Sequence, residues 1–321
     1  MLTGIQKNKR NNRQNLFCRI LALTACIVLF SFFAKHAVAG EPPHLPVEHL
    51  IDITGDFNQP TEVAVSHTGN IFVLDGANDR VAVFNENGKP LYQFGKTGAM
   101  DGELKNPVGL GLDHRDNVYI ADTGNNRIQV FDTLGNFIRK IDLTAWNARP
   151  VEVTSEKKTG RIYISDAANH QILCFNSNGS FNAAWGSYGK RTGEFKFPGM
   201  SAVDDKGDLF VVDILNGRIQ VFNPDGKNPR QVGRLGVIPG RLFRPKGIAI
   251  DPQSRIFVSD SYTGIIQVFN PDGSLYGILS RGDDFLRLTT PIGLAFDKRG
   301  RLYVVQAAAN TISVFQLPEK K

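Results

Sequence analysis

The stretch Pro107-Val-Gly-Leu-Gly-Leu-Asp113, followed by Val118-Tyr-Ile-Ala-Asp122 and Arg127-Ile-Gln-Val-Phe131, recurs in variant form along the chain. Each copy opens with a proline, and these prolines are Pro60, Pro107, Pro150, Pro198, Pro245 and Pro291. By subtraction they lie 47, 43, 48, 47 and 46 residues apart. The copies close with Phe84, Phe131, Phe175, Phe222, Phe269 and Phe315. A fixed period of this length indicates a repeat architecture, so the content of one copy predicts the fold.

Each copy reads as four short strands. In the second copy the apolar segments are 109–113, 118–122, 127–131 and 137–143, and elsewhere turns such as Asn223-Pro-Asp-Gly226 separate the strands. No segment after residue 40 keeps a helical apolar period for ten residues. The sequence therefore predicts an all-β fold, a six-bladed β-propeller of four-stranded antiparallel blades.

The two ends of the chain are expected to close this ring. The sixth copy ends near Phe315 without a fourth strand, while residues 50–54 read like the fourth-strand segment 140–144. We expect residues 50–54 to complete the last blade, because an unpaired strand edge promotes aggregation. The propeller would then span residues 50–317, with a short linker at 40–49 and a polar tail at 318–321.

Residues 1–39 have the pattern of an export leader. A basic segment with Lys7 and Arg19 precedes the apolar run 20–34, and Ala37-Val-Ala39 is a small-residue cleavage site. The predicted protein is exported to the periplasm or cell exterior of a bacterium. The alternative is an uncleaved signal anchor that holds it in the inner membrane through residues 16–38.

The basic excess of the chain comes from the leader. The whole chain has 37 Lys and Arg against 31 Asp and Glu, and residues 1–39 contribute six of the basic residues and no acidic ones, which leaves 31 of each. A balanced mature chain lacks the charge footprint of a nucleic-acid-binding protein. We therefore expect no nucleic-acid partner, and membrane contact only through the N-terminal segment.

The repeated motif Asp122-Thr-Gly-Asn-Asn-Arg127-Ile-Gln-Val-Phe131 resembles the NHL repeat, and the resemblance covers roughly residues 50–315. It implies a six-bladed propeller, a fold that hosts binding modules, scaffolds and a few lyases. The lyase-type relatives are expected to carry zinc-binding histidines directly after some blade-opening prolines. In this chain those positions are Thr61, Val108, Val151, Gly199, Lys246 and Ile292, so a zinc site of that kind is not predicted.

An aspartate ends the second strand of most copies, and an arginine follows it five residues later in three of them. The aspartates are Asp75, Asp122, Asp166, Asp213 and Asp260, and the arginines are Arg80, Arg127 and Arg218. Because the set recurs with the repeat, we interpret it as structural, with Asp accepting turn amides and Arg pairing within or between blades.

Departures from the repeat are the places where a function is expected. Two residues after the opening proline, Glu62 and Glu152 replace the small or apolar residues of the other copies. This position begins the innermost strand, so the sequence predicts two carboxylates near one mouth of the central channel. They would hold a cation or a polar ligand, or else be solvated or bonded to a neighbouring amide.

The loops that enter the blades and the turns after the repeated Asp are expected on one face. Arg234, Arg241, Arg244 and Lys246 make the sector near blade five basic, and Trp185, Tyr188 and Tyr262 are candidate aromatic anchors. The alternatives are packing of Trp185 between blades and a solvated basic rim.

These observations favour a non-enzymatic scaffold that binds a protein or peptide of the cell envelope through the long-loop face. They predict no catalytic residues and no organic cofactor. The alternative hypothesis, which is suggested by similarity in shape to gluconolactonase-like propellers, is a metal-assisted lyase or lactonase with a divalent cation near Glu62 and Glu152.

Overall fold

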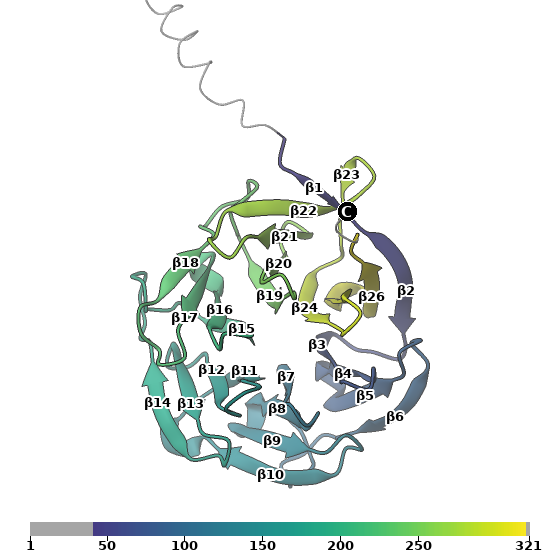
Figure 1. The fold of residues 1–321 in the computed structure, drawn as a ribbon. Coiled ribbons are helices and arrows are strands. Elements are labelled where there is room, and N and C mark those ends of the chain that lie inside the picture. Colours follow the sequence, from purple (N-terminus) through teal and green to yellow (C-terminus); the bar gives the residue numbers. More distant parts are fainter. Residues whose placement is uncertain (1–40, 319–321) are drawn as a thin grey trace, which may run out of the picture. The chain divides into compact units, whose positions relative to one another are not determined.

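The computed structural model describes residues 41–318, and within this range residues 43–318 form a ring of six sheets (Figure 1). The predicted leader at 1–39 and the last three residues of the predicted tail lie outside the described residues. In the described range no helix is both long and apolar enough for a membrane crossing.

The blades follow the repeat predicted from the sequence. Blade one contains β3 (Pro60–Val65), β4 (Ile71–Asp75), β5 (Arg80–Phe84) and β6 (Pro90–Phe94); blade two contains β7 (Gly109–Leu112), β8 (Val118–Asp122), β9 (Arg127–Phe131) and β10 (Phe137–Asp142). Blade three contains β11 (Pro150–Ser155), β12 (Ile162–Asp166), β13 (Gln171–Phe175) and β14 (Phe181–Trp185); blade four contains β15 (Pro198–Val203), β16 (Leu209–Asp213), β17 (Arg218–Phe222) and β18 (Arg230–Val232).

Blades five and six also take strands from the start of the chain. Blade five contains β19 (Pro245–Ile250), β20 (Ile256–Asp260), β21 (Ile265–Phe269) and β22 (Leu275–Arg281), extended by β1 (His44–Pro46) and β23 (Asp284–Phe285). Blade six contains β24 (Pro291–Phe296), β25 (Arg301–Gln306), β26 (Thr311–Gln316) and β2 (Glu48–Thr54). Short 3-10 helices are η1 (Gly76–Asn78), η2 (Thr123–Asn125), η3 (Thr144–Trp146), η4 (Ile214–Asn216) and η5 (Ala307–Ala309).

The predicted ring closure is confirmed. β2 pairs antiparallel with β26 and supplies the outer strand of the last blade, with Ile53 opposite Ile312. Ile53 is buried in a core that includes Val305 and Val314. The strand begins at Glu48, two residues before the segment expected from the repeat. The N-terminal strand therefore covers the edge that blade six would otherwise expose.

Part of the predicted linker at 40–49 is not a linker. Residues 44–46 form β1, which pairs in parallel with β22 on the outside of blade five, and Leu45 lies opposite Leu279. Leu45 is buried and the His44 ring stacks on Phe285 with centroids 4.4 Å apart. Three residues are too few to show an alternating pattern, so this strand depends on the sheet edge that receives it.

The core lies between neighbouring blades. The second strand of each of the first five blades, such as β8, is buried along its whole length. The closing phenylalanines are all buried; Phe131, for example, packs with Phe72 and Val83 of blade one. Burying one such side chain contributes about 2 to 3 kcal/mol. The repeat therefore makes a rigid ring that positions loops at its two faces.

Candidate binding sites in the channel and on the long-loop face

The side chain at the repeated aspartate position accepts the same backbone bond in all six copies. In each blade the backbone N–H of the residue seventeen positions earlier donates to the side chain at this position, as Lys105 does to Asp122 Oδ1 at 2.7 Å. The other acceptors, at distances of 2.6 to 2.9 Å, are Asp75, Asp166, Asp213, Asp260 and, where the sequence departs from Asp, Gln306. This contact ties the loop that enters a blade to the end of its second strand.

The three arginines complete the same structure. Arg127 Nε lies 2.7 Å from Asp122 Oδ2, and Arg80 and Arg218 pair with Asp75 and Asp213 at 2.9 and 2.8 Å. The guanidinium of Arg127 also donates to backbone carbonyls of the loop before its blade. These bonds connect the Asp and Arg side chains to their own blade and its entry loop.

A second repeated device was missed by the sequence analysis. Gln129 in the Arg-Ile-Gln-Val-Phe motif accepts the N–H of Gly102 at 2.9 Å and donates to the carbonyl of Glu103 at 2.6 Å. Gln220 and Gln267 make the equivalent pairs of bonds to their own entry loops. The signal was a buried polar residue repeated at one strand position, and it gives three long loops the same braced conformation.

These bonds confirm that the long entry loops and the Asp turns share a face. The loop into blade five, residues 233–244, is closed by a parallel bridge between Leu235 and Leu242, as the loops into blades two and four are by Thr97 with Leu104 and Tyr188 with Phe195. We call residues 233–244 the blade-five loop. Its conformation is held from inside by Gln267, so its outward side chains are carried on a fixed backbone.

The blade-five loop presents apolar and basic side chains to solvent. Leu235, Val237 and Ile238 are 51%, 57% and 58% exposed. Arg234, Arg241 and Arg244 are also exposed, and among the described residues none of them forms an ion pair. Leu215 on η4, exposed as well, precedes Gly217, whose backbone lies against Leu235. The predicted basic sector therefore contains an apolar patch that the sequence analysis did not identify.

Lys246 does not belong to this sector. It lies on β19 and lines a pocket at the channel mouth, together with the five other residues that follow the blade-opening prolines: Thr61, Val108, Val151, Gly199 and Ile292. Burial lowers the pKa of Lys246, and the charge of Arg244 lowers it further. The positions where lyase-type zinc ligands were expected are thus grouped in space, and they carry no histidine.

Of the three aromatic candidates, one packs between blades and two are exposed. Trp185 packs between blades three and four, where its partly buried ring is 5.5 Å from Tyr163 and 6.0 Å from Phe222, as the packing alternative expects. Tyr188 and Tyr262 are both largely exposed. Tyr262 rests on Phe243 of the blade-five loop, with ring centroids 4.6 Å apart.

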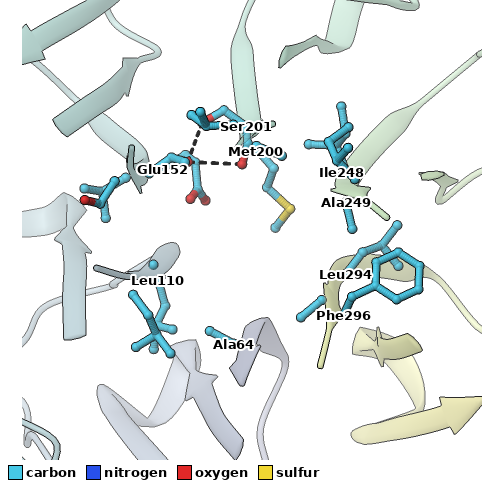
Figure 2. A pocket seen from close by; sticks show the side chains of 18 of the residues that line it. Ala64, Leu110, Glu152, Met200, Ser201, Ile248, Ala249, Leu294 and Phe296 are labelled. Atoms are coloured by element: carbon cyan, nitrogen blue, oxygen red, sulfur yellow. Dashed lines mark hydrogen bonds between the residues drawn. The ribbon is translucent and has the colours of Figure 1, made fainter. Parts of the chain in front are cut away.

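The two channel carboxyls line a cavity of about 280 Å³, in which Figure 2 shows Glu152. Glu62 and Glu152 are only 6% and 3% exposed, and each fits beside a glycine of the neighbouring blade. A Cβ on Gly109 would lie 2.7 Å from Glu152 Oε2, and one on Gly293 would lie 2.6 Å from Glu62 Oε1. The glycines therefore leave the space that the carboxyl groups fill, which only the tertiary structure shows.

The surroundings of these carboxyls are short of hydrogen-bond donors. Glu62 Oε1 accepts a long bond of 3.3 Å from the N–H of Val63, and among the described residues Glu152 Oε2 has no hydrogen-bond partner. Burial raises the pKa of Glu62 to about 8. Burial also raises the pKa of Glu152 well above its ordinary value, and the charge of Glu62 raises it further. Both carboxyls are therefore desolvated, and Glu62 keeps one long bond to a neighbouring amide.

The donor set does not fit a dedicated metal site. Within residues 41–318, no group of three or more His, Cys, Asp or Glu side chains is placed to hold a metal ion. Zinc sites use three or four such ligands, and calcium takes six to eight oxygens. Two carboxyls fall short of both requirements, so the pair does not match the coordination of a resident zinc or calcium ion.

The opposite mouth of the channel is acidic, although its short polar turns looked like solvent-facing filler in the sequence. Its rim includes Asp113, Asp116, Asp204, Asp205, Asp251 and Asp297. Asp251 and Asp297 pair with Arg255 and Arg301 of their own turns. The other four form no ion pair with Lys or Arg in the part of the chain that the structure describes. Lys157 and Lys298 also line this mouth, but the aspartates outnumber them, whereas Lys246 and Arg149 line the other mouth.

Comparison with known proteins supports the fold. A family model described as a 6-bladed beta-propeller matches residues 56–157. Protein brain tumor of Drosophila melanogaster is 28% identical over 128 residues. That match covers 39% of this chain and only 12% of the fly protein, so it relates one segment and not the whole molecule.

Solved propellers of low sequence identity have similar structures. A gluconolactonase from Xanthomonas campestris is 16% identical, with a TM-score of 0.65 over 87% of this chain and 96% of the other. A virginiamycin B lyase from Staphylococcus aureus is 14% identical, with a TM-score of 0.60 over 86% of this chain and 89% of the other. At these identities the likeness concerns the fold alone.

Proposed function

We propose that this six-bladed β-propeller, whose repeated motif resembles the NHL repeat, is an exported, non-enzymatic scaffold that binds a protein or peptide of the cell envelope. The binding surface is the blade-five loop, with Leu215 and Tyr262 beside it. One observation carries this proposal: three exposed arginines without acidic partners among the described residues surround exposed apolar side chains on a braced loop.

The energetics favour a binding role for this surface. Apolar side chains that remain exposed on a fixed backbone gain about 25 cal/mol for each Å² that a partner covers. The loop needs little reordering, because Gln267 and the bridge from Leu235 to Leu242 already hold it. A partner therefore loses little of its binding energy to ordering this side of the interface.

The side chains of the blade-five loop also indicate what kind of partner it would bind. Arg234, Arg241 and Arg244 offer guanidinium groups that bind carboxylates in pairs of hydrogen bonds. Leu235, Val237 and Ile238 offer an apolar surface between them. The expected partner segment is acidic and apolar together.

The test is capture of the partner in the native host. The full chain with a C-terminal tag is crosslinked in cells and purified, and the enriched proteins are identified by mass spectrometry. The Arg241→Glu/Arg244→Glu variant should lose the enriched protein. The matched control is Lys206→Glu/Lys227→Glu, which reverses two exposed charges in turns of the opposite face and should retain it.

Binding is then measured with the purified partner. Reversal of Arg241 and Arg244 should weaken affinity at least thirtyfold, which corresponds to about 2 kcal/mol in total, or about 1 kcal/mol for each arginine. Equal affinity of the arginine variant and the wild type, with equal melting temperatures, would refute this surface as the binding site.

A metal-assisted lyase or lactonase is the second candidate. The buried pair Glu62 and Glu152 favours a channel activity, while the number of metal-binding side chains opposes a metal-assisted one. Elemental analysis of the purified protein, with melting curves in calcium and in zinc, tests it. Stoichiometric metal that is lost in Glu62→Gln would favour this candidate over the scaffold.

A further inference from the structure

The channel carboxyls are not explained by the scaffold role. Glu62 on β3 and Glu152 on β11 reach into one cavity, yet neither pairs with a basic side chain in the described residues, and Glu152 Oε2 lacks a hydrogen-bond donor. A buried polar group without a partner is costly. The two carboxyls are therefore positioned for a group that is not part of the chain.

We propose that Glu62 and Glu152 form a binding site for a small organic cation, a protonated amine with an apolar body, inside the central channel. An ammonium group carries one positive charge and three donors in a compact head. It can donate to the unpartnered Oε2 of Glu152, and its charge is attracted to both carboxyls that line the cavity.

The rest of the cavity selects an apolar body. Figure 2 shows Leu110, Met200, Ile248 and Leu294, which come from four different blades, around the same space as Glu152. Ser201 faces the cavity too, but its hydroxyl already bonds to Thr154 at 2.7 Å. A hydrated divalent ion would find too few oxygens here, whereas a hydrocarbon chain or ring attached to an ammonium would contact these walls.

The two mouths indicate the direction of entry. Lys246 and Arg149 line the mouth on the long-loop face and repel a cation. Asp204 and Asp205 line the opposite mouth and also belong to the lining of the cavity that contains the two carboxyls. Fields of this kind raise the local concentration of an oppositely charged ligand, so the amine enters from the acidic side.

Binding is linked to proton release. Besides the pair, the charged groups that line the cavity are Glu156, Lys157 and Lys158 on the turn after β11, and Asp204 and Asp205 after β15. The strands β7, β19 and β24 add no charge at the level of the pair, where they carry Gly109, Gly247 and Gly293. Lys246 of β19 faces the other mouth. Burial raises the pKa values of Glu62 and Glu152, which favours their protonated forms when no cation is bound. A bound ammonium favours the ionised carboxylate, and affinity therefore rises with pH.

The experiment is isothermal titration of the purified full-chain protein with 2-phenylethylamine at pH 6, 7 and 8. The matched probes are 2-phenylethanol, which is neutral, and 3-phenylpropionate, which is anionic. We expect binding of the amine only, at least tenfold tighter at pH 8 than at pH 6. Buffers with different ionisation enthalpies should report release of a proton on binding.

The variants are Glu62→Gln and Glu152→Gln, with Glu48→Gln as the control, since Glu48 is exposed on β2. Each channel variant should weaken amine binding at least tenfold, and the control should bind like the wild type. Melting curves verify that each variant is folded. The proposal would be overturned by equal binding of alcohol and amine, by no amine binding at pH 8, or by unchanged binding in both channel variants. Glu62-dependent binding of calcium or zinc alone, in place of the amine, would overturn it as well.

Discussion

Replacing Glu62 by Gln should make the propeller more stable at neutral and basic pH. Burial raises the pKa of this carboxyl to about 8 from an ordinary value of 4.5. The folded state therefore binds the proton more tightly than the unfolded state does. The wild-type protein is most stable below pH 4.5 as far as this group is concerned, and it loses stability as the pH rises from there through 8.

The size of the effect follows from the shift of the pKa. Each unit corresponds to about 1.4 kcal/mol, and the shift from 4.5 to about 8 gives a loss of about 5 kcal/mol once the pH exceeds both values. Between pH 5 and pH 8 the expected loss is about 3 to 4 kcal/mol. Gln has nearly the same shape and cannot ionise, so this part of the pH dependence should be absent from Glu62→Gln.

The assay is urea unfolding of the wild type, Glu62→Gln and Glu48→Gln at pH 5, 6, 7 and 8, monitored by circular dichroism. The difference in unfolding free energy between Glu62→Gln and the wild type should increase by about 3 kcal/mol or more from pH 5 to pH 8. The exposed Glu48→Gln control should follow the wild type within about 0.5 kcal/mol. Parallel curves for Glu62→Gln and the wild type would refute the argument that Glu62 is held in a poorly solvated site.

Three further predictions concern the ring. Gly226→Ala and Gly300→Ala both place a side chain at positive φ. A Cβ at 226 would overlap the Trp185 indole, whereas one at 300 meets nothing within 4 Å. Gly226→Ala should therefore be less stable than Gly300→Ala by about 1 to 3 kcal/mol in calorimetry. Asp122→Ala removes the buried carboxylate partner of Arg127 and leaves only the exposed Asp101 at 3.6 Å, so it should cost about 3 to 5 kcal/mol in urea unfolding. A loss below about 1 kcal/mol contradicts the structural role. Truncation through β2 should produce oligomers in size-exclusion chromatography because it exposes the edge of β26, whereas truncation through β1 alone should leave a monomer.

The parts of the fold that depend on local pattern were predictable. The alternation within each copy indicated strands, and the orphan segment at 50–54 predicted the closure that β2 makes with β26. Glu62 and Glu152 were recognised as departures from the repeat at the innermost strand, and both line the channel. In each case the decisive pattern lay within one repeat or in the comparison of equivalent positions.

Other features depend on contacts between repeats. Trp185 is a residue type that often anchors interfaces, but its indole lies against Gly226 of the neighbouring blade. Lys246 lies close in sequence to Arg244 but turns into the channel mouth. Residues 44–46 form a strand only because β22 offers an edge.

The sequence by itself determined the number of blades, their strands and the closure of the ring, because side-chain alternation and turn chemistry act over a few residues and repeat with the chain. Only the tertiary structure decided which polar groups lost their water. Gly109 and Gly293 make room for carboxyls of adjacent blades, and this arrangement raises the pKa values of Glu62 and Glu152. Desolvation depends on every blade that surrounds a group, and no single repeat contains that information.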